Sequence, residues 1–181
     1  MIEIDVPFPN INYQMGALKS KNQGRTGPSY TSYTNGRLWS SANYKDGEYD
    51  GLQQSWYRND QLEYRYNYKN GKHDGLQEVW GENGQLIFKY NYDNGKREGI
   101  QEAWFAKGQL RCKSYYCNSK ETGIRETYTE FGALTQTYHI NGKEVTKREY
   151  DVYLVKLERV IYSVMNINEK GIITIIMHLL T

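Results

Sequence analysis

The chain has 181 residues, of which 38% are hydrophobic and 24% charged, and this places it within the range of soluble folded proteins. The formal net charge is +2, and lysines and arginines are spread among acidic residues, so the composition argues against a strongly basic nucleic-acid-binding protein. Tyrosine is the unusual component. The 18 Tyr and 4 Trp, against 4 Phe, suit a thin sheet with wet surfaces better than a thick core.

The N-terminal segment, residues 1–20, carries no recognisable motif. It lacks a basic region followed by an apolar run, so it does not resemble a signal peptide. The two cysteines, Cys112 and Cys117, are too few for a disulfide framework, and no histidine beside them completes a zinc site. We therefore expect an intracellular, cytoplasmic protein that needs neither a metal nor another cofactor.

A repeat of 24 residues fills the centre of the chain, from about residue 21 to residue 140. Four columns keep this spacing without gaps over four consecutive units, and a weaker copy precedes them, so we count about five units. The columns are Gly51, Gly75, Gly99 and Gly123; Trp56, Trp80, Trp104 and Tyr128; Leu62, Leu86, Leu110 and Leu134; and Tyr68, Tyr92, Tyr116 and Ile140. Self-similarity at such a period indicates a repeat array.

Each unit is predicted to form a β-hairpin followed by a turn. Within residues 86–92, large apolar or aromatic residues alternate with Lys89 and Asn91, which is the period-two pattern of a half-buried strand. Asn83-Gly84 and Asn94-Gly95 offer residues that tolerate positive φ in hairpin turns. The fold is predicted to be mainly β: a single-layer antiparallel array of hairpins, with about ten strands in a twisted meander.

Residues 141–181 differ in character and are predicted to cap the C-terminal end of the array. Thr146 and Glu149 form a capping-box pattern, and apolar residues then recur at helical spacing, so we expect a helix at about 146–165. This helix should cover the last strand, because an unpaired strand edge favours association. The apolar residues 171–181 fit a strand, a short helix or an oligomer contact, and they are too few to span a bilayer.

One unit carries the pattern Tyr-x-Asn-Gly-Lys-x-x-Gly-Leu-Gln-Glu-x-Trp, running from Tyr68 to Trp80 and continuing to Asn83-Gly84-Gln85-Leu86. This pattern resembles the MORN repeat variant family and covers roughly two thirds of the chain. The last full unit departs from it, with Asn118-Ser119 in place of Asn-Gly. The resemblance implies single-layer β arrays that act as scaffolds, dimerisation elements or partner-binding surfaces, without a catalytic motif.

Proteins of this kind include antitoxins of bacterial toxin-antitoxin systems and proteins of large DNA viruses. The resemblance therefore implies an antitoxin-like or a virion role as further possibilities, the latter with a virion location, and lipid binding has been proposed for MORN proteins more widely. The richness in Lys, Asn, Ile and Tyr is also typical of AT-rich viral genomes. A membrane surface is the less favoured partner, because the sequence has no cationic cluster.

No residue pattern predicts catalysis or metal binding. Glu78, Glu102 and Glu126 recur at 24 residues, but successive hairpins would hold them about 9 to 10 Å apart, too far to share one ion. We expect them to pair with Lys or Arg across strands. The three histidines are His73, His139 and His178, and they have no metal-ligand spacing. The protein is therefore predicted not to be an enzyme.

The predicted function is a non-catalytic protein-interaction or scaffold module, with a protein partner or self-association. Strand parity suggests that the Leu, Trp and Tyr columns share one aromatic face, while Arg65 and Lys89 lie on the other. We expect the partner on the aromatic face, because Tyr and Trp are enriched in binding hot spots. The predicted partner-binding residues are Trp56, Tyr64, Tyr66, Trp80, Phe88, Tyr90 and Trp104.

Overall fold

The structure is a computed structural model and describes residues 24–165. The strands are β1 (Gly27–Ser32), β2 (Leu38–Lys45), β3 (Glu48–Trp56), β4 (Leu62–Lys69), β5 (Lys72–His73), β6 (Gly75–Trp80), β7 (Leu86–Asp93), β8 (Lys96–Arg97), β9 (Gly99–Trp104), β10 (Leu110–Cys117), β11 (Lys120–Tyr128), β12 (Leu134–Ile140) and β13 (Lys143–Val145). One helix follows, α2 (Lys147–Met165). The predictions for residues 1–20 and 171–181 lie outside the described residues.

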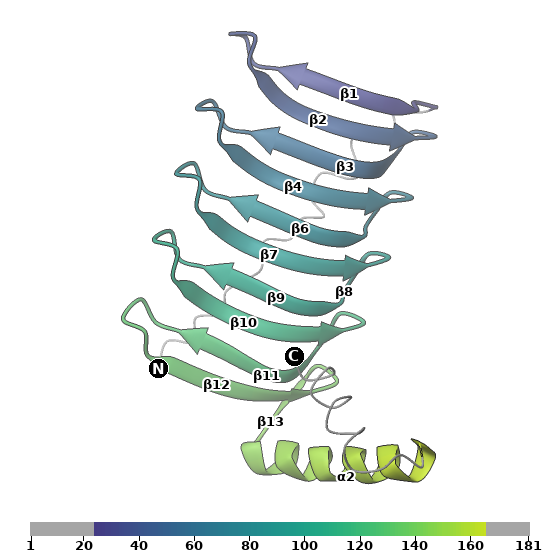
Figure 1. Cartoon of the computed structure of the whole chain (residues 1–181), viewed down its shortest axis with the longest axis vertical. Helices are drawn as coiled ribbons and strands as arrows, with labels where there is room; N and C mark the ends of the chain where they lie inside the picture. Colours follow the sequence, from purple (N-terminus) through teal and green to yellow (C-terminus); the bar gives the residue numbers. More distant parts are fainter. Residues whose placement is uncertain (1–23, 166–181) are drawn as a thin grey trace.

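The strands form one antiparallel sheet whose order is the order of the chain. The path runs β1-β2-β3-β4-β6-β7-β9-β10-β11-β12-β13, and the short strands β5 and β8 pair with β4 and β7. Figure 1 shows the result as a curved, twisted ladder with turns along both edges and α2 beside β12 and β13. The predicted mainly-β hairpin array with a C-terminal helix is confirmed.

The sheet has more strands than expected because β13 follows the last unit, and because the return strand breaks just before Gly75 and Gly99 into β5 and β6 and into β8 and β9. In one unit, β4 pairs with β5 through Tyr68↔His73 and with β6 through Arg65↔Glu78. Between these two pairs, the four residues 74–77 lie opposite only two residues of β4, 66–67, which makes a bulge. Gly75 adopts φ of 81° at this bulge, a region that L side chains rarely enter. The other glycines of this column share the conformation, with φ of 98°, 72° and 81° at Gly51, Gly99 and Gly123.

Two kinds of turn occupy the two edges of the ladder. On one edge, Asn70-Gly71 and its repeats have positive φ at both central residues, which matches the right-handed twist of the flanking strands. On the other edge, a loop such as 81–85 closes with the Gly81 amide donating to the Gln85 carbonyl over 2.8 Å. The Asn83 Oδ1 in this loop accepts the Gln85 amide over 3.1 Å.

Hydrogen bonds at both edges also join each unit to the next. The amides of Gly71 and Gly95 donate to the carbonyls of Tyr49 and His73, each over 2.8 Å. On the opposite edge, the Tyr57 hydroxyl donates to the Trp80 carbonyl over 2.9 Å. These contacts have the same offset along the sequence in successive units, so the turns hold neighbouring hairpins in register.

The helix begins with the predicted capping box. The Thr146 amide donates to the Glu149 carboxylate over 2.8 Å, and the Glu149 amide donates to the Thr146 Oγ1 over 3.2 Å. The Thr146 amide and hydroxyl both donate to the Glu149 carboxylate, and these two bonds lower the pKa of Glu149. Tyr150 is 4% exposed and packs on Tyr138 of β12, with ring centroids 5.5 Å apart. The first turns of α2 are therefore anchored to the last long strand.

Candidate interaction surfaces

The register of the hairpins divides the side chains of the sheet into two faces. Val79 pairs with Phe88 and Gln77 with Tyr90, so these residues share one face, which we call the tyrosine face. Glu78 pairs with Lys89 on the opposite face, and Trp80 follows Glu78 by two residues, so Trp80 lies there too. We call this opposite face the tryptophan face.

The expectation that the Trp column shares a face with the Tyr residues is wrong. Side chains do alternate between the faces along each strand, as predicted. Between the strands, however, every residue pair from Gly75↔Tyr92 to Val79↔Phe88 joins an odd-numbered residue to an even-numbered one. Residues of like parity on the two strands therefore point to opposite sides. The Arg65 guanidinium confirms the placement, because it lies 5.4 Å from the centroid of the Trp80 ring.

The tyrosine face is a packed aromatic layer. Tyr64 stacks on Tyr66 with centroids 4.5 Å apart, and Phe88 stacks on Tyr90 at 5.5 Å. The buried His73 ring packs against Tyr66 and Tyr92, which come from neighbouring hairpins, at 5.5 and 5.2 Å. These contacts across units make the aromatic layer continuous along the array.

Burial perturbs the titratable groups of this layer. It raises the pKa of Tyr66, Tyr68 and Tyr90 well above the usual range, chiefly because the phenolate would be desolvated. Desolvation lowers the pKa of His73, although its hydrogen bond with Gln77 acts in the opposite direction. The layer is therefore built from neutral rings at physiological pH.

A glutamine column, Gln77 and Gln101, fills the gaps that the bulges at Gly75 and Gly99 leave in the ladder. Gln77 is fully buried, and its Oε1 accepts the amide of Asn67 over 3.1 Å. Its Nε2 donates to the carbonyls of Asn67 and Gly75 over 2.9 and 3.1 Å. Gln101 repeats the donation to Asn91 over 3.0 Å. The side-chain amide thus replaces backbone bonds that the extra residues interrupt.

An asparagine column binds the other side of the same bulge. The Nδ2 groups of Asn43, Asn67 and Asn91 donate to the carbonyls of Leu52, Leu76 and Ile100. The sequence did not reveal a role for the glutamine and asparagine columns. Their 24-residue spacing was the available signal, but it does not reveal that they satisfy backbone groups next to a bulge.

The tryptophan face carries a row of charges that alternate in sign from strand to strand. Backbone pairing aligns Arg65, Glu78, Lys89, Glu102, Lys113 and Glu126 in this row. The Arg65 guanidinium contacts the Glu78 carboxylate at 2.7 Å, and the Lys89 ammonium lies 4.0 Å from Glu102. The prediction that Glu78 and Glu102 each pair with a cation on a neighbouring strand is confirmed. The hydroxyl of Tyr128 and the amide of Gln136 donate to Glu126 instead.

The predicted partner-binding residues are therefore split between the faces. Trp56, Trp80 and Trp104 lie half-buried on the tryptophan face, beside the charged row. Tyr64, Tyr66 and Phe88 are half-buried on the tyrosine face, where Tyr90 is 1% exposed. The structure brings together the residues of each set but does not join the two sets into one surface.

The described residues contain little that suggests chemistry. Within residues 24–165, no group of three or more His, Cys, Asp or Glu side chains is arranged to hold a metal ion. Cys112 is buried in the tyrosine face, 24 residues after Phe88, and Cys117 is exposed at the end of β10. Over the same residues, no helix has the length and apolar character needed to cross a membrane.

The repeat geometry agrees with the comparison to known families. The MORN repeat variant model matches three segments, residues 49–70, 74–94 and 97–118. These three segments of the chain are similar to MORN repeats. Each matched segment includes one glycine of the 24-residue column and the two long strands of one hairpin. The match describes the repeat alone and does not assign the protein to antitoxins or viral proteins. No curated protein matches the chain.

Proposed function

We propose that this protein is a non-catalytic protein-interaction module whose MORN array presents the tryptophan face to a protein partner. The observation that carries the proposal is the repetition on that face. Trp56, Trp80 and Trp104 stand at equivalent positions of three successive hairpins, next to a row of alternating charges. MORN repeats are in general modules for protein or membrane interaction.

The side chains of this face are suited to a partner that runs along the array. Adjacent hairpins repeat about every 9 to 10 Å, so an extended partner meets an indole and a charged pair at each step. Trp and Arg are the residue types most enriched in binding hot spots. The charged row would set the register of the partner, because opposite charges attract and like charges repel across an interface.

The alternation in sign favours a protein partner over an anionic membrane. Each cation of the row has a carboxylate on a neighbouring strand, so the face does not present the uncompensated positive charge that anionic lipids attract. A virion component or an antitoxin would each be a particular case of a protein-interaction function. Detection of the protein in purified virus particles would test the first.

The experiment compares two aromatic variants in affinity capture from the source cells. We expect Trp80→Ala with Trp104→Ala to abolish retention of a partner that the wild-type protein retains, because a hot-spot truncation can cost about 2 kcal/mol or more. Phe131→Ala is the control, since this aromatic side chain is 99% exposed in the loop between β11 and β12, away from the row of indoles. Circular dichroism establishes that both variants are folded.

Two outcomes would contradict the proposal. The first is a monomeric wild-type protein that retains no partner under conditions that preserve its fold. The second is a folded Trp80 and Trp104 double variant that retains the partner as well as the control does, because the indoles would then serve packing alone.

A further inference from the structure

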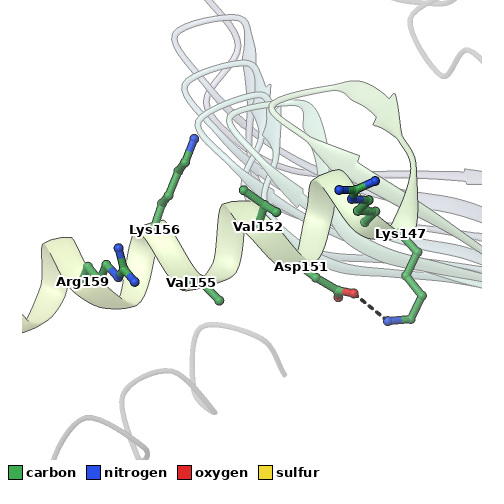
Figure 2. A pocket seen from close by; sticks show the side chains of 7 residues that line it. Lys147, Asp151, Val152, Val155, Lys156 and Arg159 are labelled. Atoms are coloured by element: carbon green, nitrogen blue, oxygen red, sulfur yellow. Dashed lines mark hydrogen bonds and ion pairs between the residues drawn. The ribbon is translucent and has the colours of Figure 1, made fainter.

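The outward face of α2 is a second surface with a chemistry of its own. Arg148, Val152, Val155 and Arg159 recur at helical spacing, and Lys156 lies beside them. Together with Lys147 and Asp151 they line an open hollow of about 650 Å³, which Figure 2 shows. The face turns away from Tyr150, the residue that anchors the helix to β12.

The cations of this face are largely uncompensated. Lys147 pairs with Asp151 at 2.9 Å, as the dashed line in Figure 2 marks, and Glu149 is engaged by Thr146. Within residues 24–165, the side chains of Arg148, Lys156 and Arg159 form no ion pair. Among the described residues, the face therefore holds three positive charges without a carboxylate partner, in contrast to the alternating row on the sheet.

The two valines between these cations are exposed. Val152 and Val155 are 49% and 48% exposed, although valine is among the residues most often buried in folded proteins. They are spaced by one helical turn, so they form a small apolar floor between Arg148 on one side and Arg159 on the other. Apolar contact is thus available at the centre and ionic contact at both ends.

A second copy of this chain is a poor occupant of the face. A two-fold contact brings the same patch of both copies together. It would place Arg148, Lys156 and Arg159 opposite an equally cationic set, and like charges across an interface are unfavourable. The carboxylate within the patch, Asp151, is already paired with Lys147. Charge complementarity therefore requires an acidic partner.

We propose that the outward face of α2 binds an acidic amphipathic segment of a partner protein. Apolar side chains of that segment cover Val152 and Val155, and its carboxylates pair with Arg148, Lys156 and Arg159. A protein segment fits the hollow better than a bilayer does, because helices that lie in a membrane interface carry Trp, Phe or Leu on the apolar face, whereas small valines line this one.

This inference deepens the proposed function and rests on it only in requiring a protein partner. The surface is different, because α2 lies beyond the last strand while the indoles lie on β3, β6 and β9. Variants of α2 and of the tryptophan face therefore separate the two. If the α2 variant loses binding of an acidic peptide and the Trp80 and Trp104 double variant keeps it, the result supports a site on α2 whether or not the tryptophan face binds a partner.

The experiment measures binding of a synthetic helical peptide to the full-length protein by fluorescence anisotropy. The peptide has about five turns, as α2 has, with leucines on one face flanked by glutamates. A second peptide carries lysines in place of the glutamates. The protein variant is Arg148→Glu, Lys156→Glu and Arg159→Glu. The matched control is Lys45→Glu, Lys69→Glu and Lys107→Glu, which changes the net charge equally at exposed sites of the array.

We expect the acidic peptide to bind the wild-type protein and the control within about twofold of each other, and the α2 variant at least about tenfold more weakly. The lysine peptide should not bind. Val152→Asn with Val155→Asn should also weaken binding while leaving the charges intact. Liposomes containing phosphatidylserine provide the membrane comparison.

The inference is overturned if the acidic peptide fails to bind the wild-type protein, or if it binds the α2 variant as well as the control. Equal binding of the lysine peptide would show that contact is apolar and unselective. Liposome binding that the α2 variant loses, without peptide binding, would assign the face to a membrane instead.

Discussion

At the scale of single residues, the repeat is specified by side chains that satisfy the backbone. Gln77 is fully buried and bonds Asn67 and Gly75 where the bulge interrupts the ladder. Loss of one partner of a buried hydrogen bond leaves the other group desolvated and unpaired, which costs more than the bond itself contributes. A polar residue is therefore required at a buried position of a sheet.

Replacement of Gln77 by leucine should destabilise the protein by about 2 kcal/mol or more, because the backbone groups of Asn67 lose their partners in a buried site. Gln109→Leu is the control at an exposed position and should change stability by less than about 0.5 kcal/mol. Urea unfolding of both variants tests this. Equal midpoints would show that the glutamine amide is dispensable.

His73 predicts a pH dependence of stability. Burial lowers the pKa of its imidazole below the ordinary value of 6.5, so the folded state disfavours the protonated ring. The unfolded chain therefore binds the proton more readily, and the His73 contribution is fully present above pH 6.5 and declines as the pH falls below it. His73→Gln should lose less stability than the wild type between about pH 7.5 and 5.5. A wild-type NMR titration with a His73 pKa above 6.5 would contradict the assignment.

At the scale of elements, the bulge and its glycine define the hairpin. Gly75 has a φ of 81°, and an added Cβ would meet Asn67 at 4.0 Å, so conformation and not crowding restricts this position. Gly75→Val should cost about 2 kcal/mol or more, because β-branched residues strongly resist positive φ. Lys89→Ala, at a 40% exposed side chain, should cost under about 0.5 kcal/mol. Chemical denaturation measures both, and equal costs would refute the conformational argument.

The sequence predicted local features well because local rules govern them. Hairpin turns at Asn-Gly pairs and the capping box at Thr146 depend on a few adjacent residues. The face of Trp80 was not predictable in the same way. It depends on the register between strands, which the loop at 81–85 and the bulge beside it determine together.

The outward face of α2 was missed for a related reason. Helical spacing predicted an apolar stripe that begins at Tyr150, and Val152 and Val155 are not part of this stripe. The structure buries Tyr150 but leaves Val152 and Val155 exposed, because the helix meets the sheet at its beginning. A pattern of apolar residues indicates amphipathicity, but the extent of contact with a neighbouring element depends on where the helix docks.

At the scale of the whole molecule, the C-terminal end of the ladder is closed by two layers of contact. β13 pairs with residues 138–140 of β12, and Tyr150 of α2 packs on Tyr138. Removal of both elements exposes an unpaired strand edge, which can pair with another chain. The closing elements therefore keep the array from extending by association at this end.

Truncation after Gly142 should make the protein self-associate, because it deletes β13 and α2 and leaves β12 as an open edge. Truncation after Val145 retains β13 and should associate less. Light scattering at increasing concentration compares the two. A monodisperse protein truncated after Gly142 would show that neither element protects the edge.

The bonds between units have a consequence for how such a chain can change length. Gly71 and Gly95 donate to the carbonyl 22 residues earlier, and Asn59 and Asn83 donate to the carbonyl 23 residues later, so each unit meets its neighbours through the same set of atoms. After an in-frame gain or loss of 24 residues, each unit could therefore still form the same hydrogen bonds with its new neighbours. Duplication within the gene could lengthen the ladder by about 9 to 10 Å per step without a new interface having to evolve. The length of the array could then change between related genes in steps of one hairpin.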